Sequence, residues 1–194
     1  DLNCGMNRTG ILPGPDARVI YEAICNAPGL MAGGLHAYDG HNHESDLAKR
    51  TEKCGSDFEP VLEFRKELEE AGLDVPNLVA SGTPTFPIHS RHTDRQCSPG
   101  TAVLWDFGYN DGLPDLPFEY AATLLTRVIS KPGANRVCLD LGHKAVAADK
   151  PQPRVRLFEM ESAMPVVHSE EHLTVETENA GNLSVGDCYY GVPV

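Results

Sequence analysis

The chain has 194 residues, enough to bury a sizeable hydrophobic core, and its 41% hydrophobic and 23% charged residues are typical of a globular protein. Its net charge of −12 argues against a nucleic-acid partner, because neutralising phosphates requires clustered Lys and Arg. No apolar run approaches about 20 residues, so we expect no membrane span or membrane partner. The six cysteines are dispersed without a CxxC pair, which favours reduced thiols and a cytoplasmic location.

Strand and helix patterns alternate up to about residue 107. Apolar residues at helical spacing predict a helix over 15–27, opened by Pro15, and a long helix over 43–73, closed by Gly72. This alternation implies parallel strands joined by helical crossovers, hence a barrel or a doubly wound sheet. The buried strands are predicted over 29–40, 77–82 and 101–106.

The pattern changes after residue 117. Short β-rich runs separated by Gly, Pro and Asn clusters predict an antiparallel β domain. We therefore expect two domains, over 1–112 and 113–194. The chain begins without methionine and stops at GVPV without a closing turn, so we expect an internal segment of a longer protein.

The stretch LHAYDGHNHE (35–44) gathers three histidines, an aspartate and a tyrosine. In an extended segment His41 and His43 share a face, so they could bind zinc or iron together. A solvated polar loop explains the same pattern. A third interpretation is acid–base chemistry or cofactor contact, for which a histidine with a near-neutral pKa is suited.

Two further motifs follow predicted strands. Ser81, Gly82 and Thr83 offer two hydroxyls and a close-approach glycine, as a phosphate cradle needs, although a plain turn stopped by Pro84 fits equally well. Arg8 lies between glycines, where it could hold an anion or a ring nitrogen.

The second half contains two candidate motifs of its own. Asp140 looks buried and stands close to the His143–Lys144 pair, which suggests catalysis, although a β-turn is the simpler interpretation. The segment HSEEH (168–172) clusters carboxylates with histidines, and an exposed charged turn again explains it more simply.

Taken together and in order, six motifs resemble the D-threonine aldolase and D-serine dehydratase family of pyridoxal-phosphate enzymes. They are DLNCGMNRTG, GLHAYDGHNHE, VASGTPTF, SPGTAVLWDFGY, LDLGHKAVAADKP and SEEH. The resemblance implies an alanine-racemase-type, fold-type III enzyme. The chain would supply the second half of a (β/α)8 barrel followed by a β-rich C-terminal domain, and the whole protein would form a homodimer.

The resemblance also implies roles for individual residues. Tyr38 would lie against the cofactor ring, and Arg8 near that ring. His43, with His41 as the second candidate, would be the active-site histidine near the substrate. The cofactor phosphate would be bound by Ser81, Gly82 and Thr83.

In two respects the chain departs from the family pattern. The lysine that binds the cofactor lies on the first barrel strand, and no lysine here matches it. The metal pair, which would hold Zn, Mn or Mg, is expected beyond Val194, so we expect this segment to be inactive alone. Glu170, Glu171 and His172 would then orient those metal ligands without binding the metal themselves.

The activity implied by the resemblance is cleavage of a small D-β-hydroxy amino acid. Pyridoxal phosphate serves as an electron sink and a divalent metal holds the β-hydroxyl, so that D-threonine gives glycine and acetaldehyde. D-serine dehydratase activity is the alternative within the family. Two alternatives lie outside it: a non-catalytic cofactor-binding or interaction protein, and a metal-dependent hydrolase using His41 and His43.

Overall fold

The computed structural model describes residues 1–80 and 82–194. The chain divides into two compact units. Unit 1 consists of Asp1–Val103 with Gly112–Leu116, and unit 2 of Leu104–Asp111 with Pro117–Val194. Across the described part of the chain, no helix combines the length and apolarity needed to cross a membrane.

Unit 1 is built on a three-stranded parallel sheet. Its strands are β1 (Leu35–Ala37), β2 (Leu78–Ala80) and β3 (Gln96–Cys97), in that order. On the other side of β1, Leu2 forms an isolated parallel bridge with Ala37. The segment that precedes residue 3 therefore runs beside β1 in the direction of the sheet, and four neighbouring segments end at the same edge.

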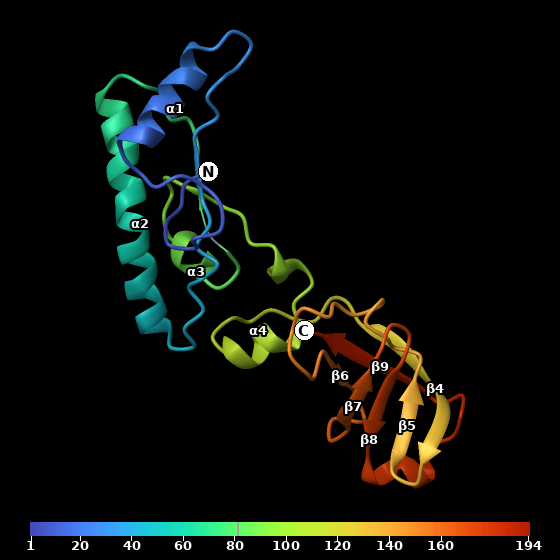
Figure 1. The fold of residues 1–194 in the computed structure, drawn as a ribbon. Coiled ribbons are helices and arrows are strands. Elements are labelled where there is room, and N and C mark those ends of the chain that lie inside the picture. The colour runs from blue at the N-terminus through green and yellow to red at the C-terminus, as the bar shows by residue number, and fades with distance from the viewer. Residues whose placement is uncertain (81) are drawn as a thin grey trace. The chain divides into compact units, whose positions relative to one another are not determined.

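Two helices flank the strands of unit 1 (Figure 1). They are α1 (Pro15–Asn26) and α2 (Leu47–Glu70), and α2 is the crossover between β1 and β2. Both predicted helices are confirmed. In α2 the apolar stripe is buried, whereas in α1 only Ala17 and Tyr21 are buried, and Val19 and Ile20 are exposed. The core of the unit includes Ala17, Tyr21, Leu35, Ala37, Phe58, Val61, Phe64, Leu68, Leu78 and Ala80.

The ends of α2 are fixed by local hydrogen bonds. At its start the Asp46 carboxylate accepts the Lys49 N–H at 2.9 Å, so the helix begins four residues later than predicted. At its end Gly72 adopts φ +78°, and the Leu73 N–H donates to the Leu68 carbonyl. This is a Schellman cap, and it explains the glycine expected there.

Two predicted strands differ from the structure. The prediction over 29–40 is too long, since β1 occupies only its last part. The prediction over 101–106 is wrong: Thr101–Val103 is a 3-10 turn, and Trp105 has a positive φ of 57° that no strand adopts. The third strand is instead β3, a two-residue segment between polar neighbours.

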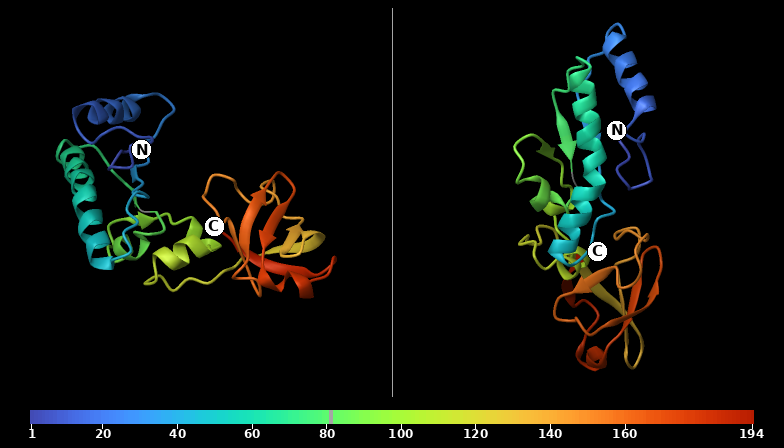
Figure 2. Two further views of the ribbon diagram at one scale, coloured as in Figure 1. Left: turned by 60° about the horizontal axis from the view of Figure 1, so that its bottom comes forward. Right: turned by 90° about the vertical axis from the view of Figure 1, so that its left-hand side faces the viewer.

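Unit 2 is a curled six-stranded antiparallel sheet, as the β-rich runs predicted (Figure 2). The strand order is β6-β9-β4-β5-β8-β7. Unit 2 also contains two short helical segments, α4 (Phe107–Gly112) and η2 (Glu178–Asn182). The last residue of α4 belongs to unit 1. The strands are β4 (Leu124–Gly133), β5 (Arg136–Leu139), β6 (Val155–Leu157), β7 (Met164–His168), β8 (Leu173–Glu176) and β9 (Cys188–Pro193).

Candidate functional site

The polar motifs of unit 1 follow the carboxyl ends of its parallel segments. Residues 3–10 follow the Leu2 segment, residues 38–44 follow β1, and residues 82–85 follow β2. Parallel strands bring such loops to one edge of the sheet, where α/β proteins place their active sites. We take this edge as the candidate site.

Tyr38 lies at the centre of the three loops. The Arg8 guanidinium lies 5.0 Å from the centroid of its ring, a cation–π contact between two loops. A Cβ on Gly82 would lie 3.0 Å from Tyr38 Cε2, and a Cβ on Gly40 would lie 2.1 Å from the tyrosine hydroxyl. A Cβ on Gly40 would clash with the ring, and a Cβ on Gly82 would require the ring or the backbone to shift slightly. The fold therefore brings Arg8, Tyr38 and Gly82 together.

The predicted phosphate cradle is more enclosed than the sequence suggested. Gly82 and Thr83 are both buried. The Gly82 N–H donates to Asp39 Oδ1 at 2.9 Å, and Thr83 Oγ1 accepts the Ala102 N–H at 3.3 Å. Two of the predicted phosphate-binding groups thus already have partners within the protein. Ser81, the third residue of the prediction, lies outside the described residues.

The two candidate histidines differ in how they are held. His41 Nε2 lies 2.8 Å from Asp57 Oδ2, and the same carboxylate accepts from Lys53 Nζ at 2.9 Å. His41 Nδ1 is buried, and within the described ranges it has no hydrogen-bond partner. His43, in contrast, is exposed. A carboxylate that fixes one imidazole nitrogen leaves the other to exchange a proton with a ligand.

Sequence reasoning missed a buried polar group at this edge, formed by Asp39, Cys54 and His89. Their ligand-type atoms all lie within 4.8 Å of one another. Asp39 Oδ2 lies 2.9 Å from His89 Nε2 and 3.5 Å from Cys54 Sγ, and His89 Nε2 lies 3.2 Å from the same sulfur. The only signal in the sequence was that Asp39 directly follows Tyr38 in the histidine-rich stretch.

Opposing effects set the ionisation of this group. Burial raises the pKa of Asp39, but hydrogen bonds from His89, Thr85 and the Gly82 N–H outweigh it and hold that pKa below its ordinary value. Burial, reinforced by the Asp39 charge, raises the pKa of the Cys54 thiol to about 12. These surroundings favour the neutral thiol beside an ionised carboxylate.

This environment predicts which thiols react. We expect iodoacetamide at pH 8 to label Cys25 and Cys188, which are exposed, and to leave Cys54 unmodified in the native protein, because the thiolate is the nucleophile. Cys4 is also buried, and burial raises its pKa to about 11, so it should be protected in the same way. Mass spectrometry of tryptic peptides measures this. All should react after unfolding in urea; native labelling of Cys54 as fast as that of Cys25 would contradict the prediction.

In unit 2, Asp140 is exposed, so the prediction that it is buried is wrong. Its Oδ1 accepts the Thr126 hydroxyl at 3.0 Å and the Arg127 N–H at 2.7 Å. The residue follows β5 and bonds back to β4, which makes it a link between strands. The apolar neighbours that suggested burial belong to the opposite face of the alternating strand.

The other two motifs of unit 2 lie side by side. The His143 N–H donates to the Ser169 carbonyl at 2.8 Å and the Lys144 N–H to the Glu170 carbonyl at 3.0 Å. Lys144 Nζ also lies 2.7 Å from a Glu171 carboxylate oxygen. These charges are exposed, where ion pairs contribute little to stability. The arrangement has the form of paired surface turns.

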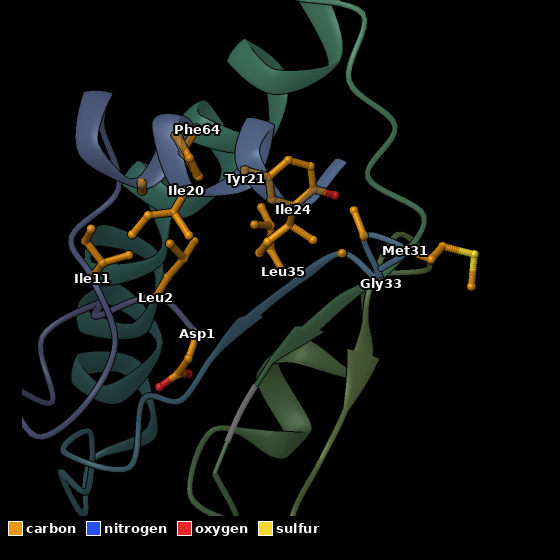
Figure 3. A pocket seen from close by; sticks show the side chains of 13 residues that line it. Asp1, Leu2, Ile11, Ile20, Tyr21, Ile24, Met31, Gly33, Leu35 and Phe64 are labelled. Carbon is orange, nitrogen blue, oxygen red and sulfur yellow. The ribbon is translucent and has the colours of Figure 1, made fainter. Parts of the chain in front are cut away.

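A pocket of about 240 Å³ lies elsewhere in unit 1 (Figure 3). It is formed mainly by apolar side chains from α1 and from the start of β1, including Ile20, Ile24 and Leu35. The Tyr21 hydroxyl, one of its few polar groups, already donates to the Asp74 carbonyl at 2.7 Å. The pocket therefore lies toward the amino end of β1, away from the loops that follow the carboxyl ends of the strands, so it is not the candidate site.

Comparison with known proteins gives the relationship. Residues 121–194 match the family described as "Putative serine dehydratase domain". D-threonine aldolase from Arthrobacter sp is 25% identical over 159 residues, covering 80% of this chain and 42% of that protein. 3-hydroxy-D-aspartate aldolase from Paracoccus denitrificans (strain Pd 1222) is 27% identical over 202 residues, covering 100% of this chain and 51% of that protein. The chain thus spans about half the length of these relatives.

Solved structures extend the relationship to the fold. D-threonine aldolase from Filomicrobium marinum has a TM-score of 0.88 and 26% identity, over 98% of this chain and 52% of that one. An alanine-racemase-like protein from Idiomarina loihiensis has a TM-score of 0.77 and 18% identity, over 98% and 55% of the two chains. The predicted fold class, part of an alanine-racemase-type barrel followed by a β-rich domain, is confirmed. These matches support the resemblance of the chain to the D-threonine aldolase and D-serine dehydratase family.

Proposed function

We propose that the complete protein is a lyase for small D-β-hydroxy amino acids that cleaves D-threonine to glycine and acetaldehyde. The observation that carries the proposal is the meeting of Arg8, Tyr38 and Gly82 at the carboxyl edge, in a chain 26% identical to a D-threonine aldolase. An aromatic face, a cation and a glycine turn suit a planar, phosphorylated cofactor.

The residues present fit pyridoxal phosphate. The fit rests on the turn at Gly82. A Cβ at this position would crowd the Tyr38 ring, and a phosphate that binds the turn would also have to come close to its backbone. Because the Gly82 N–H is bonded to Asp39, we assign the phosphate contact to the neighbouring Thr83 amide, and the role of Ser81 stays an expectation from the sequence. When bound, the cofactor supplies an electron sink for the bond broken at the substrate Cα.

This chain's own side chains have separate tasks in the proposal. Tyr38 and Arg8 bind and orient the ring. His41 or His43 exchanges a proton with the substrate hydroxyl, since an imidazole can do so near neutral pH. The Glu170–His172 turn would orient the ligands of a divalent metal, Zn, Mn or Mg, which would supply polarisation of that hydroxyl. We also propose that the complete protein is a homodimer in the cytoplasm.

D-serine dehydratase activity is the second candidate. It is favoured by one specific observation, the match of residues 121–194 to a serine dehydratase domain family. The two reactions share the substrate class and differ in whether the Cα–Cβ bond or the bond to the β-hydroxyl breaks.

Product analysis on the complete protein tests the proposal. With pyridoxal phosphate and Mn²⁺, we expect glycine and acetaldehyde from D-threonine, none from L-threonine, and loss of turnover after chelation, because the metal engages the substrate hydroxyl. L-threonine is the matched control for stereochemistry. Ammonia and a keto acid from D-serine would identify the dehydratase instead, and turnover that survives exhaustive chelation would contradict both activities.

A further inference from the structure

Asp39 is the most heavily bonded buried side chain of the candidate site. It is 1% exposed, and both of its oxygens accept hydrogen bonds. Oδ1 accepts the Gly82 N–H at 2.9 Å and the Thr85 hydroxyl at 2.6 Å. Oδ2 faces His89 Nε2 at 2.9 Å. One carboxylate therefore connects the loop after β1 to the turn after β2 and to α3 (Phe86–His89).

The other side of His89 fixes the direction of these bonds. Arg95 Nη1 lies 3.4 Å from His89 Nδ1. A guanidinium can only donate, so Nδ1 accepts, and the imidazole proton resides on Nε2, where it points to Asp39. The His89 ring is also packed edge-on against Phe58 at 4.6 Å. The Asp39 carboxylate is thus held by a histidine whose own ring is fixed by packing and by hydrogen bonds.

The same observations argue against a metal ion among Asp39, Cys54 and His89. Each ligand-type nitrogen and oxygen is already hydrogen-bonded, and the positive Arg95 lies beside the imidazole. A cation there would displace these bonds and meet a like charge. Hydrogen bonding accounts for the group without an ion.

The Gly82 turn is held at both ends. Its carbonyl accepts the Phe86 N–H at 3.1 Å, and its amide is bound by Asp39. Its Cα lies so near Tyr38 that a Cβ would be only 3.0 Å from the ring. A shift of this turn would therefore change the distance between the ring-binding and phosphate-binding parts of the site.

We infer that Asp39 is a positioning residue, which fixes the Gly82–Thr85 turn against Tyr38 so that the cofactor's phosphate and ring bind together. The inference rests on the proposed function. Asp39 need not touch the cofactor: it acts through the Gly82 amide and the Thr85 hydroxyl, and His89 holds it in place. The phosphate end of the cofactor, not the ring end, should depend on it.

The test compares two ligands that differ only in the phosphate. In the complete protein, Asp39→Asn places an amide N–H or a misplaced oxygen against donors. It should weaken binding of pyridoxal 5′-phosphate about 10- to 100-fold, the range seen when an orienting partner is removed. Binding of pyridoxal, which has no phosphate, should change far less. Absorbance titration gives both dissociation constants.

Two further variants keep the test decisive. Asp46→Asn removes a carboxylate at the start of α2 and keeps a good cap, so both affinities should be unchanged. Thr85→Val removes only one hydrogen bond to Asp39 and should weaken phosphate-dependent binding by a smaller factor. It decides the question if Asp39→Asn fails to fold.

The outcomes separate the inference from the proposed function. Equal losses for both ligands, or zinc that copurifies with the protein and disappears in Asp39→Asn, would overturn the positioning role alone. Failure of the unsubstituted protein to bind pyridoxal 5′-phosphate would overturn the proposed function and the inference with it. A selective loss of the phosphorylated ligand supports both.

Discussion

Replacing Arg50 with alanine is expected to destabilise unit 1 by about 3 kcal/mol, because it breaks a buried ion pair by removing one partner. The Arg50 side chain is 0% exposed and pairs with Asp115, while its Nη1 donates to the Glu44 carbonyl at 2.6 Å. The guanidinium thus links the start of α2 to the loop after β1 and to the 112–116 segment. Asp115 is 24% exposed, so water can reach the charge left behind, which places the loss at the lower end of about 3–5 kcal/mol.

Amide hydrogen exchange of α2 measures this loss of stability directly within unit 1. A loss of 3 kcal/mol would speed exchange of its protected amides by about 100-fold. Lys66→Ala is the matched control, since it removes a cation of the same helix that is 75% exposed and should cost less than about 0.5 kcal/mol. Exchange in Arg50→Ala that stays within the range of this control would show that the buried pair does not stabilise the unit.

The sequence predicts those elements whose apolar residues repeat with a short period or whose ends carry a local capping signal. The α2 stripe at Phe58, Val61, Phe64 and Leu68 identifies the helix, and Gly72 identifies its end. The start was less exact, because the choice of Asp46 as cap depends on which carboxylate reaches a free N–H.

Short apolar runs carry no such period. The run over 101–106 fits a strand as well as a turn, and the left-handed Trp105 backbone that excludes a strand has no signature in the sequence. The β-rich runs predicted after residue 117 did not include β7, which has the opposite difficulty. Its valines Val166 and Val167 are exposed on an edge strand with an irregular register, so alternation is lost.

Some residues of the candidate site could be predicted from the sequence, and others could not. Arg8, Tyr38 and Gly82 were predictable neighbours, because each follows a strand and parallel strands end at one edge. Asp39, Cys54 and His89 were not, because they are 15 and 35 residues apart in turn and meet through the packing of α2 and α3 on the sheet. A buried polar side chain looks, in sequence, like any loop residue.

The structure reverses the ranking of the two candidate active-site histidines. The resemblance placed His43 first and His41 second. The contacts favour the reverse, because Asp57 holds His41 Nε2 at 2.8 Å while Nδ1 stays buried with no partner in the described part of the chain, and His43 is exposed. A buried polar atom without a partner calls for a ligand that supplies one.

Replacing His41 with alanine in the complete protein is therefore expected to lower kcat for D-threonine cleavage by about 10²- to 10⁴-fold, the usual contribution of a general acid or base. Asp57→Asn should lower kcat by a smaller factor, because it removes the group that orients the imidazole and leaves the imidazole itself. His43→Ala should have the weaker effect of the two histidine variants, and His92→Ala, an exposed histidine after α3, should have none.

Steady-state kinetics with acetaldehyde detection gives kcat for each variant, and titration with pyridoxal phosphate shows that cofactor binding is retained. If the loss instead falls on His43→Ala and spares His41→Ala, the His41–Asp57 pair serves the fold, and the exposed histidine is the one that meets the substrate.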